Sequence, residues 1–152
     1  MIQSFIRLTT EEKLANHNVI IIDSREFKSS LPPTLYKANF ILLPYTLEIC
    51  DYVLAPMIGV ERKAYQDLVS SLRHGRLQRQ MQRMVRTYKY PVLLIESFDN
   101  ELKSGLSSIV SRLCVLIRCF PQMRILWSFS EMNSVNVFLI HSFIHSLKSL
   151  TI

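Results

Sequence analysis

The stretch IGVERKAYQDL at residues 58–68 decides the fold, because its pattern changes from strand to helix within a few residues. Ile58–Lys63 is typical of a strand that either continues the preceding strand, Asp51–Ala55, or pairs with it as a hairpin. From Ala64 to Tyr90 the apolar residues recur with a helical period. The stretch therefore predicts a strand that leads directly into helices.

Strands and helices alternate on both sides of this stretch. The β-branched run Val19–Ile22 ends at Asp23 and predicts a buried strand, and Gly75 divides the helical region into two helices. The expected strands are Val19–Ile22, Phe40–Leu47, Asp51–Ala55, Ile58–Lys63, Val92–Glu96 and Met123–Phe129. The expected helices are a short one within Ser24–Lys37, then Ala64–Arg73, Arg76–Lys89, Ser104–Phe120 and Glu131–Leu150. This order predicts an α/β fold in which helices cover a mainly buried sheet.

The length and composition predict one folded domain. The chain has 152 residues, 49% of them hydrophobic, which suffices for a core without disulfides or a structural metal. No repeat or linker-like stretch divides it, so we expect a single domain over residues 1–152 with its core at about 19–150. Three cysteines without a C-x-x-C pair, and the lack of a secretory signal, predict an intracellular protein. The most apolar window, residues 135–147, is too short to span a membrane.

The net charge of +6 is concentrated in one segment. Residues 61–90 contain eight Lys and Arg residues against two acids, which equals the excess of the whole chain. Arginines at spacings of three, four and three form one stripe on the expected helix: Arg76, Arg79, Arg83 and Arg86. Such a stripe is typical of a surface that binds DNA phosphates, and the alternative is an ordinary solvated helix face.

A group of charged residues surrounds the predicted hairpin. Glu61 and Lys63 are two residues apart on one strand, so their side chains point to the same face, and a hairpin brings Asp51 beside them. Two carboxylates at the end of a sheet are suited to Mg²⁺ or Mn²⁺, and a nearby ammonium can orient an attacking water and stabilise charge on a phosphate. This spacing is typical of restriction-enzyme-like nucleases. The alternative is a cluster of surface salt bridges on an edge strand.

The residues around this group resemble a known family. The motifs that carry the resemblance are VERKxxxDL at 60–68, TLExxDY at 46–52, GRLxxQ at 75–80, YKxPVLLIE at 88–96, IDxREF at 22–27 and FPxxRILW at 120–127. Together they resemble the nuclease domain of XPF-type structure-specific endonucleases, in its eukaryotic branch, whose signature is GDx(n)ERKxxxD. The resemblance implies a restriction-endonuclease-like fold, with a central mixed sheet flanked by helices.

The resemblance implies a role for each residue of the signature. Asp51 and Glu61 would bind Mg²⁺, with Mn²⁺ able to substitute, and the backbone carbonyl of Arg62 would be a further ligand. Lys63 would be the catalytic lysine. Asp67 would hold Arg62 or Lys63 in place.

Further residues are implied around the same cleft. Asp23 and Arg25 would line it, and Glu48 and Glu96 are additional candidates. The sequence departs from the family pattern at two positions. Cys50 stands where the family has a glycine, and Ser97 interrupts the usual I-E-F-D motif. Neither departure removes a metal ligand.

The function that the resemblance implies is metal-dependent nicking of one DNA strand near a junction between duplex and single strands. The setting would be DNA repair in the nucleus, such as nucleotide excision or crosslink repair. The alternative is a catalytically weak scaffold of the same family that dimerises and positions DNA. Because the chain retains Asp51, Glu61 and Lys63, we expect the enzyme. We expect no helix-hairpin-helix module within these 152 residues.

The last helices predict a partner surface. They are more apolar than one small sheet requires, and the resemblance implies a dimer with another copy or with a homologous non-catalytic subunit. The residues expected at this surface are Ile109, Leu113, Leu116 and Ile117 with Phe138, Phe143, Ile144 and Leu147. His141 and His145 have the spacing of a metal pair, and simple packing is the alternative because no third ligand is evident.

Overall fold

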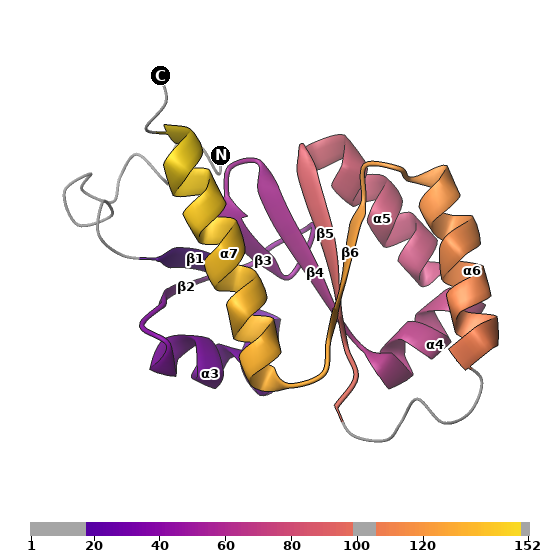
Figure 1. Cartoon of the computed structure of the whole chain (residues 1–152), viewed down its shortest axis with the longest axis horizontal. Coiled ribbons are helices and arrows are strands. Elements are labelled where there is room, and N and C mark those ends of the chain that lie inside the picture. The colour runs from indigo at the N-terminus through magenta and orange to yellow at the C-terminus, as the bar shows by residue number, and fades with distance from the viewer. Residues whose placement is uncertain (1–17, 99–105, 150–152) are drawn as a thin grey trace.

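The centre of the molecule is a six-stranded mixed sheet with the strand order β2-β1-β3-β4-β5-β6. It is seen in a computed structural model that describes residues 18–98 and 106–149 (Figure 1). The strands are β1 (Val19–Asp23), β2 (Ile41–Tyr45), β3 (Tyr52–Ala55), β4 (Ile58–Ala64), β5 (Tyr90–Glu96) and β6 (Arg124–Ser128). β3 runs antiparallel to both of its neighbours, and the other neighbouring strands pair in parallel. The predicted hairpin is confirmed, since Tyr52 pairs with Val60.

Helices cover both faces of the sheet, as the α/β prediction requires. They are the 3-10 helix η1 (Ser24–Lys28), α3 (Leu31–Lys37), α4 (Tyr65–Arg73), α5 (Arg76–Thr87), α6 (Leu106–Cys119) and α7 (Glu131–Ser149). In Figure 1, α4, α5 and α6 lie on one side of the sheet and α3 and α7 on the other. No helix in the described part of the chain is long and apolar enough to cross a membrane.

Alternation along the strands divides the core into two layers. Leu93 and Ile95 of β5 pack in the layer that includes α4, α5 and α6. Val92 and Leu94 pack in the opposite layer, against α3 and α7. Strand β5 is buried on both faces, which explains its continuous apolar run.

Because of the strand directions, one end of every strand lies at the same edge of the sheet. The five mutually parallel strands end there, and the antiparallel β3 begins there. This edge therefore carries Asp23 at the end of β1, Asp51 before β3, and Glu96 at the end of β5. It is the edge at which the charged residues meet.

The expected partner surface is partly wrong. Ile109 and Leu113 pack in the chain's own core, and Phe138 is fully buried with its ring edge-on to Tyr52, 5.1 Å between centroids. Apolar spacing along a helix cannot distinguish the sheet beneath it from a second subunit, and here the sheet takes these residues. Leu116 and Ile117 are half-buried. The side chains of Phe143, Ile144, Leu147, His141 and His145 lie outside the described residues.

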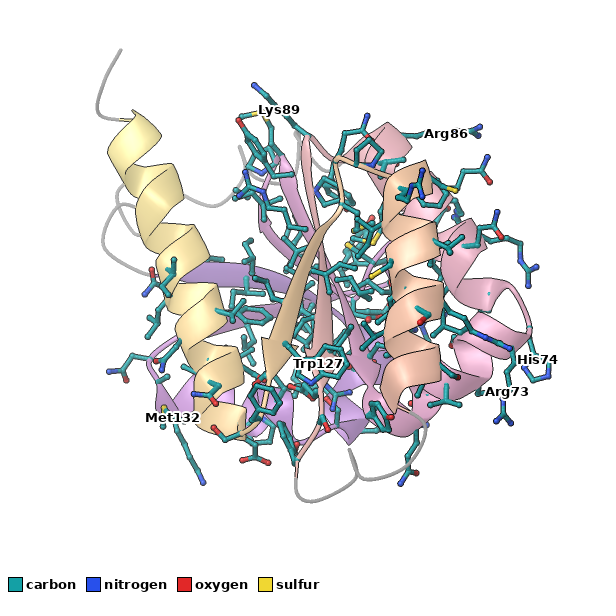
Figure 2. The ribbon with its side chains drawn as sticks, turned by 45° about the vertical axis from the view of Figure 1, so that its right-hand side comes forward. Arg73, His74, Arg86, Lys89, Trp127 and Met132 are labelled. Atoms are coloured by element: carbon teal, nitrogen blue, oxygen red, sulfur yellow. The ribbon has the colours of Figure 1, made fainter. Side chains whose placement is uncertain are left out.

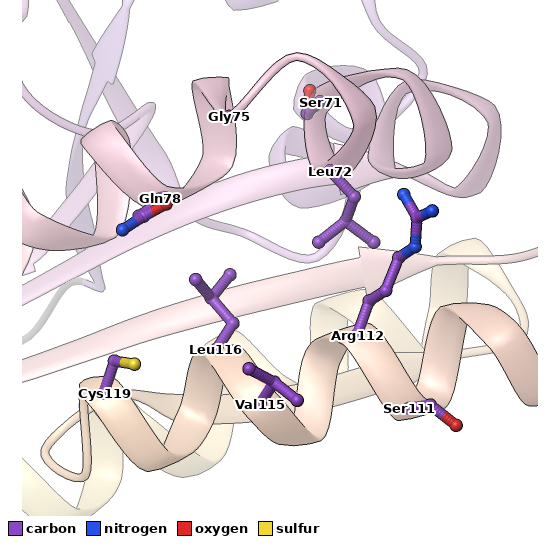
Figure 3. A pocket seen from close by; sticks show the side chains of 9 residues that line it. All are labelled: Ser71, Leu72, Gly75, Gln78, Ser111, Arg112, Val115, Leu116 and Cys119. Carbon is purple, nitrogen blue, oxygen red and sulfur yellow. The ribbon is translucent and has the colours of Figure 1, made fainter.

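The outer side of α6 does present apolar side chains. Val115 is 65% exposed and Val110 is 41% exposed. A hollow of about 450 Å³ lies between α6 and the turn that joins α4 to α5, where Leu72 and Leu116 point toward each other (Figure 3). The exposed apolar surface of α6 is therefore displaced from the stripe that the sequence predicts.

Candidate active site

Asp51 lies directly before β3 and Glu61 lies on β4, the two strands of the hairpin. The backbone N–H of Asp51 donates to the carbonyl of Val60 at 2.9 Å, and its carboxylate accepts from the backbone N–H of Arg62 at 2.7 Å. Burial, and then the negative charge of Glu61, raise the pKa of Asp51 to about 7. Glu61 is thus close enough to disfavour the charged form of Asp51. Such a pair binds a cation favourably.

Lys63 lies against Glu61 on the same face of β4, as the strand alternation predicts. Its Nζ is 2.9 Å from Glu61 Oε1 and donates to Gln80 Oε1 at 3.2 Å. Lys63 is only 7% exposed. A buried ammonium is costly unless it is paired, and here one carboxylate and one amide pair it.

Gln80 is a site residue to which the sequence analysis assigns no role, although it ends the GRLxxQ motif. It lies on α5, and its Nε2 donates to Glu61 Oε1 while its Oε1 accepts from Lys63. The signal in the sequence is a polar residue beside the apolar stripe of Leu77 and Met81. Gln80 therefore fixes both members of the Glu61–Lys63 pair from the helix above them.

Arg62 points to the opposite face of β4. Its guanidinium pairs with Glu96 at 2.6 Å and with Glu26 at 3.6 Å. Asp67 is exposed and lines a hollow of about 290 Å³ together with Arg62 and Glu96. In the described structure the ion pairs of Arg62 are thus with Glu96 and Glu26, and that of Lys63 is with Glu61. The holding role predicted for Asp67 falls to these residues instead.

Asp23 and Arg25 form an ion pair at the same edge. The Asp23 carboxylate accepts from Arg25 Nη2 at 2.7 Å, from Arg25 Nε at 2.8 Å and from the backbone N–H of Leu47 at 3.0 Å. The hydrogen bonds of Arg25 lower the pKa of Asp23. The backbone N–H of Asp23 donates to the carbonyl of Asp51 at 2.8 Å, which places this pair beside the two carboxylates.

Cys50 adopts a backbone conformation that is usual for glycine. Its φ is +66°, in the left-handed region that favours glycine. The thiol is buried, with Sγ 3.3 Å from the carbonyl of Tyr52 and 3.4 Å from the hydroxyl of Tyr88. Burial raises the pKa of Cys50 to about 12, so the thiol stays protonated. The backbone before Asp51 is therefore in the left-handed region with a buried side chain at Cys50.

The remaining candidates occupy different environments. Glu48 is exposed in the segment between β2 and β3, whereas Glu96 is buried beside Arg62. Ser97 is also buried, and its backbone N–H donates to the carbonyl of Ser128 at 2.9 Å. Of the two additional glutamates, Glu96 is the one whose carboxylate pairs with Arg62.

The donor set of the site fits Mg²⁺. The described residues contain no group of three or more His, Cys, Asp and Glu side chains that could hold a metal ion. Mg²⁺ does not need such a group, because it keeps several waters and uses one or two carboxylates with substrate phosphate oxygens. Asp51 and Glu61 are two such carboxylates, and a divalent cation between them would offset the repulsion of their charges.

The four arginines of the α5 stripe are all exposed. Arg76 and Arg83 lie about one helical turn on either side of Gln80, which enters the site. Figure 2 shows Arg86 reaching away from the molecule near the far end of α5. The stripe thus begins next to the carboxylates and continues along the surface. Arg76 is also tied to Ser71, with Nη2 2.7 Å from the hydroxyl oxygen.

The mixed sheet, with its two carboxylates and lysine across one hairpin, has the fold of the restriction-endonuclease-like nucleases. It superposes on XPF from Aeropyrum pernix with a TM-score of 0.75 and 22% identity, covering 84% of this chain and 65% of that one. A second structure, of XPF from Aeropyrum pernix in complex with DNA, gives a TM-score of 0.76 at 22% identity, covering 87% of this chain and 66% of that one.

The ERCC4 domain model matches residues 22–140, and the chain belongs to this family. It is 41% identical over 138 residues to the DNA repair endonuclease UVH1 of Arabidopsis thaliana, covering 84% of this chain and 14% of UVH1. It is 37% identical over 141 residues to the DNA repair endonuclease XPF of Mus musculus, covering 84% of this chain and 15% of that protein. The chain thus spans about a seventh of the length of these relatives. The resemblance found in the sequence is confirmed.

Proposed function

We propose that the chain is the catalytic domain of a metal-dependent endonuclease that nicks one strand of DNA near a junction between duplex and single strands. The observation that carries this proposal is the joint placement of Asp51, Glu61 and Lys63 in one partly buried site. The curated relatives are DNA repair endonucleases, which supports a role in nuclear DNA repair. An inactive scaffold would not need a buried lysine fixed against a carboxylate.

The residues divide the work of hydrolysis among them. Asp51, Glu61 and the carbonyl of Arg62 would hold Mg²⁺, whose chemistry is to neutralise charge on the phosphate and acidify the attacking water. Lys63 has three N–H donors, and Glu61 and Gln80 engage two of them. The third is left to orient the water or to stabilise charge on the phosphate. The water oxygen bonds to phosphorus as the bond from phosphorus to the leaving deoxyribose oxygen breaks.

The proposed partners are a branched or splayed-arm DNA and a second protein subunit. The second subunit would be a homologous non-catalytic chain or another copy of this one. What supports it is the apolar surface of α6, where Val115 is exposed and lines the hollow in Figure 3 and Val110 is also exposed. This surface is distinct from the edge of the sheet that carries the carboxylates.

The direct test is cleavage of a splayed-arm duplex labelled on each strand, with Mg²⁺ or Mn²⁺, by this chain alone and with its partner subunit. We expect one strand to be cut near the junction and a linear duplex of the same sequence to remain intact. Chelation of the metal should stop the reaction. Binding of the splayed arm without a nick, with the partner present, would contradict the nuclease and favour the scaffold.

We expect Gln80→Ala to slow cleavage by about 10- to 100-fold, because hydrogen bonds to charged groups contribute about 1.5–3 kcal/mol. Gln80 touches both Glu61 and Lys63, so its loss should lower the single-turnover rate and leave DNA affinity nearly unchanged. The control is Gln78→Ala, on the same helix but facing the hollow beside α6. Equal rates for the two variants would exclude the positioning role.

We expect the double variant Arg79→Gln/Arg83→Gln to weaken DNA binding and to reduce the slope of log affinity against log salt by about two, because each arginine that neutralises a phosphate contributes roughly one to that slope. The measurement is fluorescence anisotropy over a series of salt concentrations. Arg112→Gln/Arg118→Gln is the matched control, because it removes two exposed arginines from α6. An unchanged slope in the α5 variant would mean that the stripe is a solvated helix face.

A further inference from the structure

Ser134, near the start of α7, is a fully buried hydroxyl that touches the site from outside every motif of the family signature. Its Oγ donates to Glu96 Oε1 at 2.6 Å. Its single proton goes to the carboxylate, because a charged acceptor forms the stronger hydrogen bond. Ser128 Oγ lies 2.8 Å from Ser134 Oγ and is also fully buried.

The other oxygen of Glu96 contacts Arg62, whose backbone carbonyl is a proposed metal ligand. Glu96 Oε2 accepts from Arg62 Nε at 2.6 Å, and Arg62 Nη2 is also 2.6 Å from it. The main chain of Arg62 in turn donates its N–H to Asp51 Oδ2 at 2.7 Å. Two short contacts, the side chain of Arg62 and the hydrogen bond of its backbone N–H therefore join α7 to Asp51, a proposed metal ligand.

The start of α7 is itself fixed, so the Ser134 hydroxyl is held in place before any ligand binds. The N–H of Ser134 donates to the carbonyl of Ser130 at 3.1 Å, and the N–H of Asn133 donates to Ser130 Oγ at 3.1 Å. Thr34 Oγ1 donates to Glu131 Oε2 at 3.2 Å, which ties α7 to α3. Two helices far apart in the sequence thus hold one hydroxyl against Glu96.

We propose that Ser134 is a positioning residue for the metal site, acting through Glu96 and Arg62. The inference rests on the proposed function, because it assigns a purpose to the carbonyl of Arg62 as a metal ligand. Glu96 is 4% exposed, and removing the hydroxyl leaves one oxygen of a buried carboxylate without its partner. The carboxylate then turns or shifts, and the Arg62 guanidinium that it holds loses its fixed orientation.

The first test needs no metal. The Arg62 Nε–H is held by Glu96, so its resonance should exchange slowly with water in NMR spectra of the metal-free protein. We expect Ser134→Ala to speed that exchange at least about fivefold. The control is Ser71→Ala, which removes another buried hydroxyl, one that bonds Arg76 and not Glu96 or Ser134, and it should leave the exchange unchanged. Equal exchange in wild type and Ser134→Ala, or equal acceleration in both variants, would overturn the proposal.

The second test is binding of Mn²⁺, followed by the EPR signal of the free ion. Loss of a residue that supports metal ligands weakens metal affinity about 10- to 100-fold, and we expect about tenfold for Ser134→Ala with less than about twofold for Ser71→Ala. Wild-type affinity in Ser134→Ala would overturn the positioning of the metal site. If the wild type itself bound no Mn²⁺, the proposed function would fail, whereas the exchange of Arg62 Nε–H would still decide whether Ser134 positions Arg62.

Discussion

Asp51→Ala and Lys63→Ala are each expected to abolish nicking of a splayed-arm duplex, with single-turnover rates lowered at least about a hundred- to a thousandfold. Asp51 is a proposed metal ligand, and Lys63 is the proposed donor to the attacking water or the phosphate, through the N–H that Glu61 and Gln80 do not engage. DNA affinity should change little, because the α5 arginines remain. Single-turnover cleavage with saturating protein separates the rate of the reaction from DNA binding. Wild-type rates in either variant would refute the assignment of the site.

The raised pKa of Asp51 predicts how a further variant, Asp51→Asn, changes stability. That pKa rises from 3.8 in the unfolded chain to about 7 in the fold, so the folded state binds the extra proton and wild-type stability falls as pH rises from 3.8 to 7. Asp51→Asn removes this titration while keeping an oxygen that can accept from Arg62 N–H. We therefore expect metal-free Asp51→Asn to be at least as stable as wild type at pH 8. Glu48→Ala, an exposed acid, is the control for loss of charge alone.

Phe138→Ala is expected to lower the free energy of unfolding by about 3–5 kcal/mol, the usual cost of deleting a buried ring. Phe138 has no exposed surface and packs edge-on against Tyr52, the residue after Asp51. Urea denaturation measures the effect. Ile140→Ala, 55% exposed on the same helix, should change stability by less than about 0.5 kcal/mol.

Phe138→Ala and a variant of α6, Val115→Glu, distinguish the core from the proposed partner surface. Val115→Glu should weaken concentration-dependent association in sedimentation equilibrium and leave unfolding nearly unchanged, because Val115 is 65% exposed. Phe138→Ala should lower the free energy of unfolding and leave the association nearly unchanged while the protein remains folded. Stability equal to wild type in Phe138→Ala would mean that α7 is not seated on the sheet as the structure shows.

The sequence predicts the part of the site that strand geometry determines. Glu61 and Lys63 share a face because side chains alternate along a strand, and the hairpin brings Asp51 beside them by local pairing alone. Both relations need only a few residues of sequence. They are therefore visible without knowledge of how the helices pack.

The sequence does not show how side chains on different helices and strands contact one another. The Gln80 contact with Lys63 depends on the rotation of α5 about its axis, and the Ser134 contact with Glu96 depends on where α7 crosses the sheet. Asp67 shows the same limit, because proximity along a helix does not decide which carboxylate pairs with Arg62. The apolar spacing of α6 and α7 likewise shows which residues seek burial but not which surface buries them.

The antiparallel setting of β3 has a consequence for the order in which the molecule folds. The β3–β4 hairpin closes across a short turn, whereas each parallel pair must wait for a crossover through a helix. A hairpin forms in about 1–10 μs, faster than long-range strand pairing. Asp51 and Arg62, only 11 positions apart, therefore meet in the most local of the sheet contacts. We therefore expect the carboxylate pair to take shape early in the folding reaction, before the helices that carry Gln80 and Ser134 dock.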